Sequence, residues 1–361
     1  MKSSTKKQVF NIFIVLALSV FTIVTILVNS DELNFSNIKK FVTDANPWYI
    51  GAAFICWICF VLLEALSIHI ILKAFRIKPK IQSSIAYSTS DIYYSAITPS
   101  ASGGQPASAY YMIRDGIPSG ISGFTLVFNL MGYTAAIIII GAISLIFGFD
   151  IFLQIPTFIQ ILIGIGFILQ IGLLIFFIAC MAHASLVKKF ANFIIKILSK
   201  LKIIKNKNKW LDRIESLVDK YKGCYTALKR HKKTILPVIL INTAQRFSQI
   251  LISVFVCKAA IDCSFVEMVI MQGLVLLGYN SLPLPGGSGA FEYLYLEIFA
   301  LSLPSSYVVV AMMVTRFISY YFSMIATGIY TLVYHMMPQR KKKVEKVVNE
   351  NESSCFEIIE N

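Results

Sequence analysis

The chain has 361 residues, of which 57% are hydrophobic and 14% are charged, and its formal net charge is +14. So large an apolar share leaves too little polar surface for a water-soluble protein of this length. The composition therefore excludes a soluble protein and predicts an all-α, polytopic integral membrane protein.

Six apolar stretches are long enough to cross about 30 Å of hydrocarbon as helices. They cover residues 9–29, 48–75, 120–149, 156–181, 235–256 and 307–335. The first lacks a small-residue cleavage site before Asp31, so we predict a retained helix instead of a signal peptide. Two further apolar stretches, 81–113 and 264–303, are interrupted by Pro and Gly. We expect each to form a re-entrant helical hairpin, which protein or a hydrated cavity must shield.

Cations define the expected orientation. With both termini in the cytoplasm, the outer loops hold only Lys39, Lys40 and Lys258 of the 33 Lys and Arg residues, a strong positive-inside bias. We therefore predict a multi-pass protein of the cell membrane with cytoplasmic N- and C-termini. Anionic lipids of the inner leaflet, and not nucleic acid, are the partners that the net charge indicates.

The two interrupted stretches divide the chain into matching units. Residues 48–149 and 235–335 each contain a span, an interrupted hairpin and a second span, and the two units have opposite orientations in the membrane. This pattern predicts an inverted-topology repeat within a transmembrane domain of residues 1–339. Between the units, residues 188–233 are predicted to form a basic amphipathic cytoplasmic linker. Residues 340–361 are expected to be a disordered charged tail. The alternative is that the small residues in the breaks only permit close helix packing.

Ionisable residues inside apolar stretches are the sharpest pointers to function, because each costs about 2.5–3.5 kcal/mol at a helix centre. Guanidinium groups bind phosphate in a planar fork, and carboxylates bind amines. A set with both signs therefore favours a phospholipid headgroup over an ion. The alternative is that these charges pair only to hold the bundle together. The candidates are Arg114, Arg246, Arg316, Glu64, Asp91 and Glu292.

The breaks themselves add candidate residues. Glycine permits positive φ and close approach of the backbone to a ligand, and helix N-termini after a break present N–H donors to an anion. The candidates here are Gly103, Gly104 and Gln105 in the first break, and Gly286 and Gly287 in the second. The seven cysteines show no ligand-like clustering beyond the pair Cys56 and Cys59, which lies inside a predicted helix, and no Gly-rich run precedes Lys-Ser or Lys-Thr. We expect no metal, no cofactor and no catalytic residue.

At these breaks the sequence resembles the transmembrane region of the bacterial lysylphosphatidylglycerol synthase/flippase proteins. The resemblance rests on residues 98–106 with Tyr110 and 115–117, and on residues 283–292. It extends from the first span to about His335. It implies a bundle with two re-entrant hairpins that moves aminoacylated or related phospholipids between leaflets. The best-known members confer resistance to cationic antimicrobial peptides, and the resemblance implies a link of this chain to the same resistance.

Those members also carry a soluble acyltransferase-like domain that takes lysine from charged tRNA. The sequence ends at Asn361 without it, so we expect a flippase-like translocase without lysyltransferase activity of its own. Two alternatives stay open. One is phosphatidylglycerol lysyltransferase activity with a separate catalytic partner, and the other is a non-lipid transporter or a membrane scaffold. The sequence is also compatible with a homo-oligomer.

Overall fold

The computed structural model describes residues 41, 43–98, 101–183, 185–186, 188–189, 192–193, 232–280, 282 and 287–337. Within these ranges the regular structure is entirely helical, which confirms the all-α prediction. The predicted first span at 9–29, most of the linker at 188–233, the tail at 340–361 and Gly286 lie outside the described residues.

Five helices in the described part of the chain are long and apolar enough to cross a membrane. They are α3 (Pro47–Ala74), α6 (Ser119–Phe147), α8 (Thr157–Ala182), α11 (Ile235–Ala260) and a continuous helix over Ser305–Met336. The last consists of α14 (Ser305–Arg316), a π-helical segment (Phe317–Phe322) and α15 (Ser323–Met336). These bounds lie within a few residues of five predicted spans. The third span ends at Phe147 instead of 149, because the short helix α7 (Phe149–Gln154) starts beyond Gly148.

Both interrupted stretches form helix, break and helix. The first contains α4 (Ile81–Ala96) and α5 (Gly104–Arg114), and the second contains α12 (Phe265–Tyr279) and α13 (Ala290–Phe299). In each pair the two helices pack against each other. Helix α4 ends before Pro99, since proline disfavours helical backbone in the residue before it. Helix α13 begins after Gly289, whose φ of 87° suits glycine alone.

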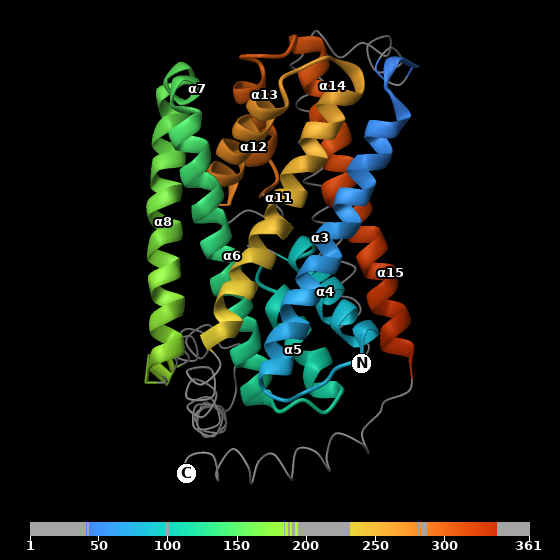
Figure 1. Ribbon diagram of the computed structural model, residues 1–361, viewed down its shortest axis with the longest axis vertical. Coiled ribbons are helices and arrows are strands. Elements are labelled where there is room, and N and C mark those ends of the chain that lie inside the picture. Colours follow the sequence, from blue (N-terminus) through green and yellow to red (C-terminus); the bar gives the residue numbers. More distant parts are fainter. Residues whose placement is uncertain are drawn as a thin grey trace.

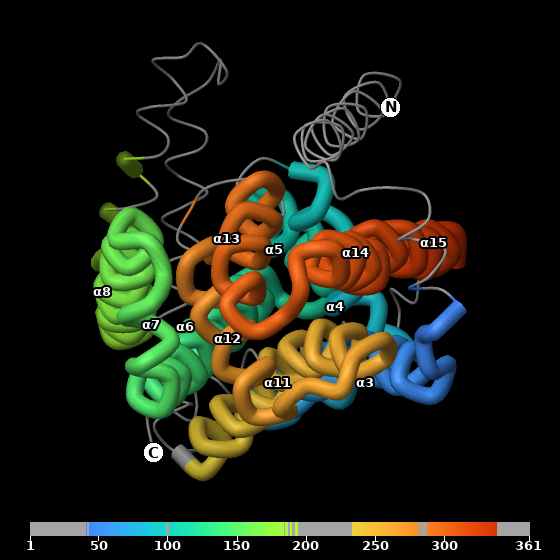
Figure 2. Tube along the Cα trace, turned by 90° about the horizontal axis from the view of Figure 1, so that it is seen from above, coloured from blue at the N-terminus to red at the C-terminus, as the bar shows by residue number. Residues whose placement is uncertain are grey.

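The two helix pairs lie in opposite halves of the long axis (Figure 1). Helix α3 runs down, α4 and α5 lie at the lower end, and α6 returns upward. Helix α11 then runs up, α12 and α13 lie in the upper half, and α14 to α15 runs down. Figure 2 shows α3 beside α11 in the bundle and α8 at its edge. Only 17% of the apolar window of α8 is buried, so the described part of the chain leaves most of this helix uncovered.

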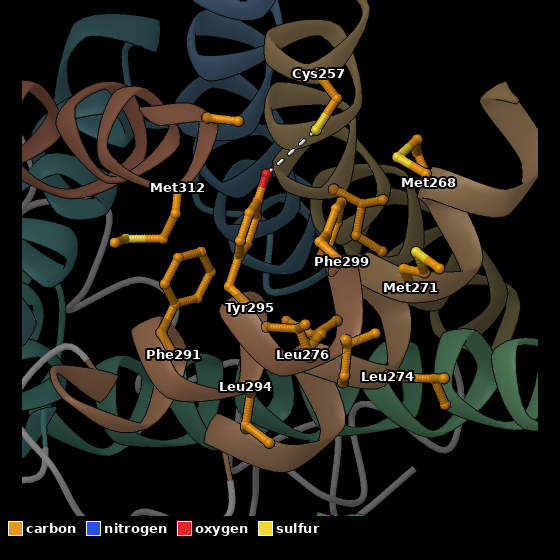
Figure 3. Close-up of a cluster of buried hydrophobic side chains, with 14 of the residues drawn as sticks. Cys257, Met268, Met271, Leu274, Leu276, Phe291, Leu294, Tyr295, Phe299 and Met312 are labelled. Carbon is orange, nitrogen blue, oxygen red and sulfur yellow. Dashed lines mark hydrogen bonds between the residues drawn. The ribbon is translucent and has the colours of Figure 1, made fainter. Parts of the chain in front are cut away.

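A buried apolar cluster fixes the second helix pair against α11 (Figure 3). The rings of Tyr295 and Phe299 stack with centroids 4.0 Å apart, and the Tyr295 hydroxyl meets the Cys257 sulfur at 3.2 Å. Tyr295 and Phe299 are fully buried. Because Tyr295 lies one turn beyond Glu292 on α13, the packing that anchors the helix also positions that carboxylate.

A buried polar triad joins α3, α6 and α11. Ser67 donates to Asn129 Oδ1 at 2.5 Å, and Asn242 Nδ2 donates to Ser67 Oγ at 2.9 Å. Interhelical hydrogen bonds of this kind stabilise helix pairs in a membrane by about 0.6 kcal/mol on average. Glu64 and Arg246 lie one turn from Ser67 and Asn242, so the triad sets the relative position of these two charges.

Candidate functional site

Three charged side chains from three helices gather in the lower half of the bundle. Glu64 on α3, Asp91 on α4 and Arg246 on α11 are 6%, 7% and 8% exposed. At 1.5 Å per residue, Arg246 lies about 17 Å above the start of α11 and Glu64 about 15 Å above the end of α3. Arg246 interacts electrostatically with both carboxylates. We call these three residues the lower cluster.

Amide side chains satisfy the carboxylates of the lower cluster. Gln105 Nε2 donates to Asp91 Oδ2 at 2.7 Å, and Gln245 Nε2 donates to Glu64 Oε2 at 3.1 Å. Gly104 lets the start of α5 approach Asp91, because a Cβ there would lie 2.0 Å from Asp91 Oδ1. The predicted residues Gly104 and Gln105 thus meet the predicted residue Asp91. Gly103 closes the same turn by donating its N–H to Thr98 Oγ1 at 2.9 Å.

Arg246 itself retains unused hydrogen-bonding capacity. Its guanidinium carbon lies 4.2 Å from the ring centroid of Tyr133 and 4.9 Å from that of Phe60. Nη1 donates to Gln249 Oε1 at 2.8 Å, whereas the buried Nε has no hydrogen-bond partner among the described residues. A buried guanidinium with a spare N–H is suited to donate a hydrogen bond to an anionic oxygen.

A second charge pair, the upper cluster, consists of Arg316 and Glu292. Arg316 Nε donates to Glu292 Oε1 at 2.7 Å, and both residues are buried. The other carboxylate oxygen accepts the Gly289 N–H at 2.7 Å. Glu292 therefore occupies the N-terminus of α13, where we had expected an anionic headgroup to bind. The observed contacts of this pair are those expected if the two charges pair to hold the helix bundle together.

Tyr320 connects the two breaks. Its hydroxyl donates to the Ala96 carbonyl oxygen at 3.0 Å at the end of α4, and it also interacts with Ser288 in the second break. Its ring centroid lies 4.9 Å from the guanidinium carbon of Arg316. The residue belongs to the π-helical segment, a rare geometry that occurs frequently at functional sites. The sequence carried no signal for this segment.

The two clusters are linked through tyrosines that sequence reasoning did not select. Tyr279, at the end of α12, interacts electrostatically with both Arg246 and Arg316. Tyr133 faces Arg246 and donates to Asn280 Oδ1 at 2.8 Å. Gly287, with φ of 67°, packs against the Tyr279 ring, which a Cβ would approach to 2.6 Å. One polar strip thus runs between the two breaks.

Arg114 lies apart from both clusters. It donates to the Met337 carbonyl oxygen at 2.7 Å and faces the rings of Tyr111 and Tyr334. Its neighbour His335 is about 28 Å along the helix from Arg316 at 1.5 Å per residue. The structure therefore does not bring Arg114 together with the other candidate arginines, and its contacts tie α5 to the end of α15.

We expect the Tyr320→Phe substitution to destabilise the protein by about 1 kcal/mol, because the buried Ala96 carbonyl loses its side-chain donor. Unfolding in mixed detergent micelles measures this cost. Tyr321→Phe is the matched control, and no bond from the Tyr321 hydroxyl is seen within the described chain. Equal stability of the two variants would show that the bridge between the breaks contributes nothing.

Five apolar spans and buried charges of both signs define a multi-pass helical membrane protein with a polar interior. The model of the family described as lysylphosphatidylglycerol synthase TM region matches residues 12–327, so the chain belongs to this family. This confirms the predicted resemblance and indicates a lipid-related function in the membrane. A comparison with curated proteins finds no match.

Proposed function

We propose that the protein moves phospholipids between the leaflets of the cell membrane, with aminoacylated phosphatidylglycerol or a related lipid as substrate. The observation that carries the proposal is Arg246: the residue is only 8% exposed, its guanidinium lies beside the rings of Phe60 and Tyr133, and its Nε has no hydrogen-bond partner among the described residues. A lipid phosphate supplies the missing acceptor, because guanidinium and phosphate match in geometry and charge.

Charge of the opposite sign beside Arg246 supports a headgroup that carries an amine. Glu64 and Asp91 interact electrostatically with Arg246, and among the described residues the other side chains that donate to them, Gln105, Gln245, Ser88 and Ser95, are uncharged. An ammonium group would bind there while the phosphate binds Arg246. Lysine attached to phosphatidylglycerol, as the family description implies, provides such a group.

The arrangement of the breaks supports alternating access. Helix pairs at opposite ends of the long axis are the pattern expected of two inverted repeats that rock around a fixed site. In this proposal residues 48–149 and 235–335 are the repeats, both termini are cytoplasmic, and basic surface residues contact anionic inner-leaflet lipids. Outward movement of a cationic lipid would lower the attraction of the cell surface for cationic antimicrobial peptides.

Reconstituted vesicles test the proposal. Wild-type protein should move fluorescent phosphatidylglycerol derivatives between leaflets faster than empty vesicles do. Arg246→Ala should lower the rate about 10- to 100-fold, because a hydrogen bond to a charged group contributes about 1.5–3 kcal/mol. Lys78→Ala removes an exposed cation beyond the end of α3 and should match wild type.

Two results would contradict the proposal. If lipids move no faster in vesicles with wild-type protein than in empty vesicles, the proposed translocase function is wrong. If the Arg246→Ala variant and wild type move lipids at equal rates, Arg246 is not the phosphate site. Uptake of a water-soluble anion without lipid movement would instead favour the non-lipid transporter.

A further inference from the structure

The carboxyl groups of Glu64 and Asp91 lie within hydrogen-bonding distance of each other. Helices α3 and α4 pack closely on both sides of Glu64, since Ser88 donates to the Val61 carbonyl at 3.1 Å and His69 Nδ1 lies 2.9 Å from Ser84 Oγ. Two carboxylates at this distance in a buried site cannot both stay ionised, and they share a proton instead. A hydrogen bond between two carboxyl groups itself requires that proton.

Charge balance gives the same result. The lower cluster holds two acids and one arginine, and an uncompensated charge is costly in a buried site. With one proton on the acid pair, the cluster is neutral. Among the described residues, the other side chains that interact with the pair do not ionise near neutral pH. They are Gln105 on α5, Tyr133 on α6, Gln245 on α11, and Ser88 and Ser95 on α4.

We propose that Glu64 and Asp91 form a proton-binding site that keeps the lower cluster neutral, so that headgroup binding at Arg246 is linked to proton uptake or release. The linkage rests on the proposed function, whereas the proton site does not. A headgroup that brings net negative charge favours a second proton on the pair. A headgroup with net positive charge displaces the proton already there. By thermodynamic reciprocity, a pH difference across the membrane then biases headgroup binding.

Lipids of graded headgroup charge test the linkage. Calorimetric titrations in buffers of different ionisation enthalpy count the protons exchanged when short-chain lipids bind to the protein in detergent. We expect uptake of about one proton with phosphatidylglycerol, none with phosphatidylethanolamine, and release of about one with lysyl-phosphatidylglycerol, from the neutrality of the cluster. Equal proton counts for all three lipids would overturn the linkage while leaving lipid binding intact.

The Glu64→Gln variant sharpens the experiment. Its remaining acid, Asp91, should be ionised opposite Arg246, so release with lysyl-phosphatidylglycerol should disappear and uptake with phosphatidylglycerol should persist. Glu297→Gln is the matched control, because it makes the same change on α13, outside both clusters. Retained release in the Glu64→Gln variant would contradict the proposal.

The proton itself can be observed without any lipid. Infrared spectra of the protein at neutral pH should show the carbonyl stretch of a protonated carboxyl group, and Glu64→Gln should remove it. If no lipid binds but this band behaves as expected, the proposed function fails and the proton site stands. If Glu64→Gln leaves the spectrum unchanged, or the wild-type band is absent, the proton site fails whatever the lipids do.

Discussion

Glu292→Ala is expected to destabilise the protein by about 3–5 kcal/mol, because it removes the carboxylate that pairs with the buried Arg316 guanidinium. The same change removes the acceptor for the Gly289 N–H at the start of α13. Equilibrium unfolding in mixed micelles measures the loss. Glu297→Ala, on the same helix and outside the pair, should cost far less.

Double variants separate the two roles of Glu292. In Glu292→Ala with Arg316→Ala, no buried charge is left alone, so the cost should be clearly below the sum of the single changes. The swapped pair Glu292→Arg with Arg316→Glu restores opposite charges but places a cation at the N-terminus of α13, where the helix dipole opposes it. We therefore expect the swap not to restore stability. Additive single costs would show that the two residues do not interact.

The long helices were predictable because apolar length alone specifies a span, and the bounds of α3, α8 and α11 lie within a few residues of those expected. Both breaks were predictable for a local reason, since Pro and Gly stop helices wherever they lie. Gln105 was selected for its position in the first break, and its bond to Asp91 joins that break to the lower cluster.

The division of the charges into two clusters was not predictable. Sequence places Arg246 and Arg316 near the middle of their spans, but only packing decides that Arg316 pairs with Glu292 while Arg246 faces Glu64 and Asp91. The position of Arg114 depends in the same way on where α15 ends. The π-helical segment and the role of Tyr320 depend on contacts between distant helices, which no local pattern records.

Gly104→Ala should disrupt the lower cluster through the backbone. The added Cβ would lie 2.0 Å from both Asp91 Oδ1 and Ser95 Oγ, and 2.7 Å from the Asp91 carbonyl oxygen. A side chain can rotate away, but the carbonyl belongs to α4 and moves only with the helix. Overpacking of this kind costs about 1–3 kcal/mol. We expect that loss in unfolding experiments and, under the proposed translocase function, a lower rate of lipid movement.

Gly123→Ala on α6 is the matched control, because nothing lies within 4 Å of its added Cβ. Alanine is favoured over glycine in a helix by up to about 1 kcal/mol, so this variant should be as stable as wild type or more so. A Gly104→Ala protein that matched the Gly123→Ala protein in both stability and rate would mean that α5 can shift freely from Asp91. The close approach of the first break to the lower cluster would then have no part in positioning the proposed headgroup site.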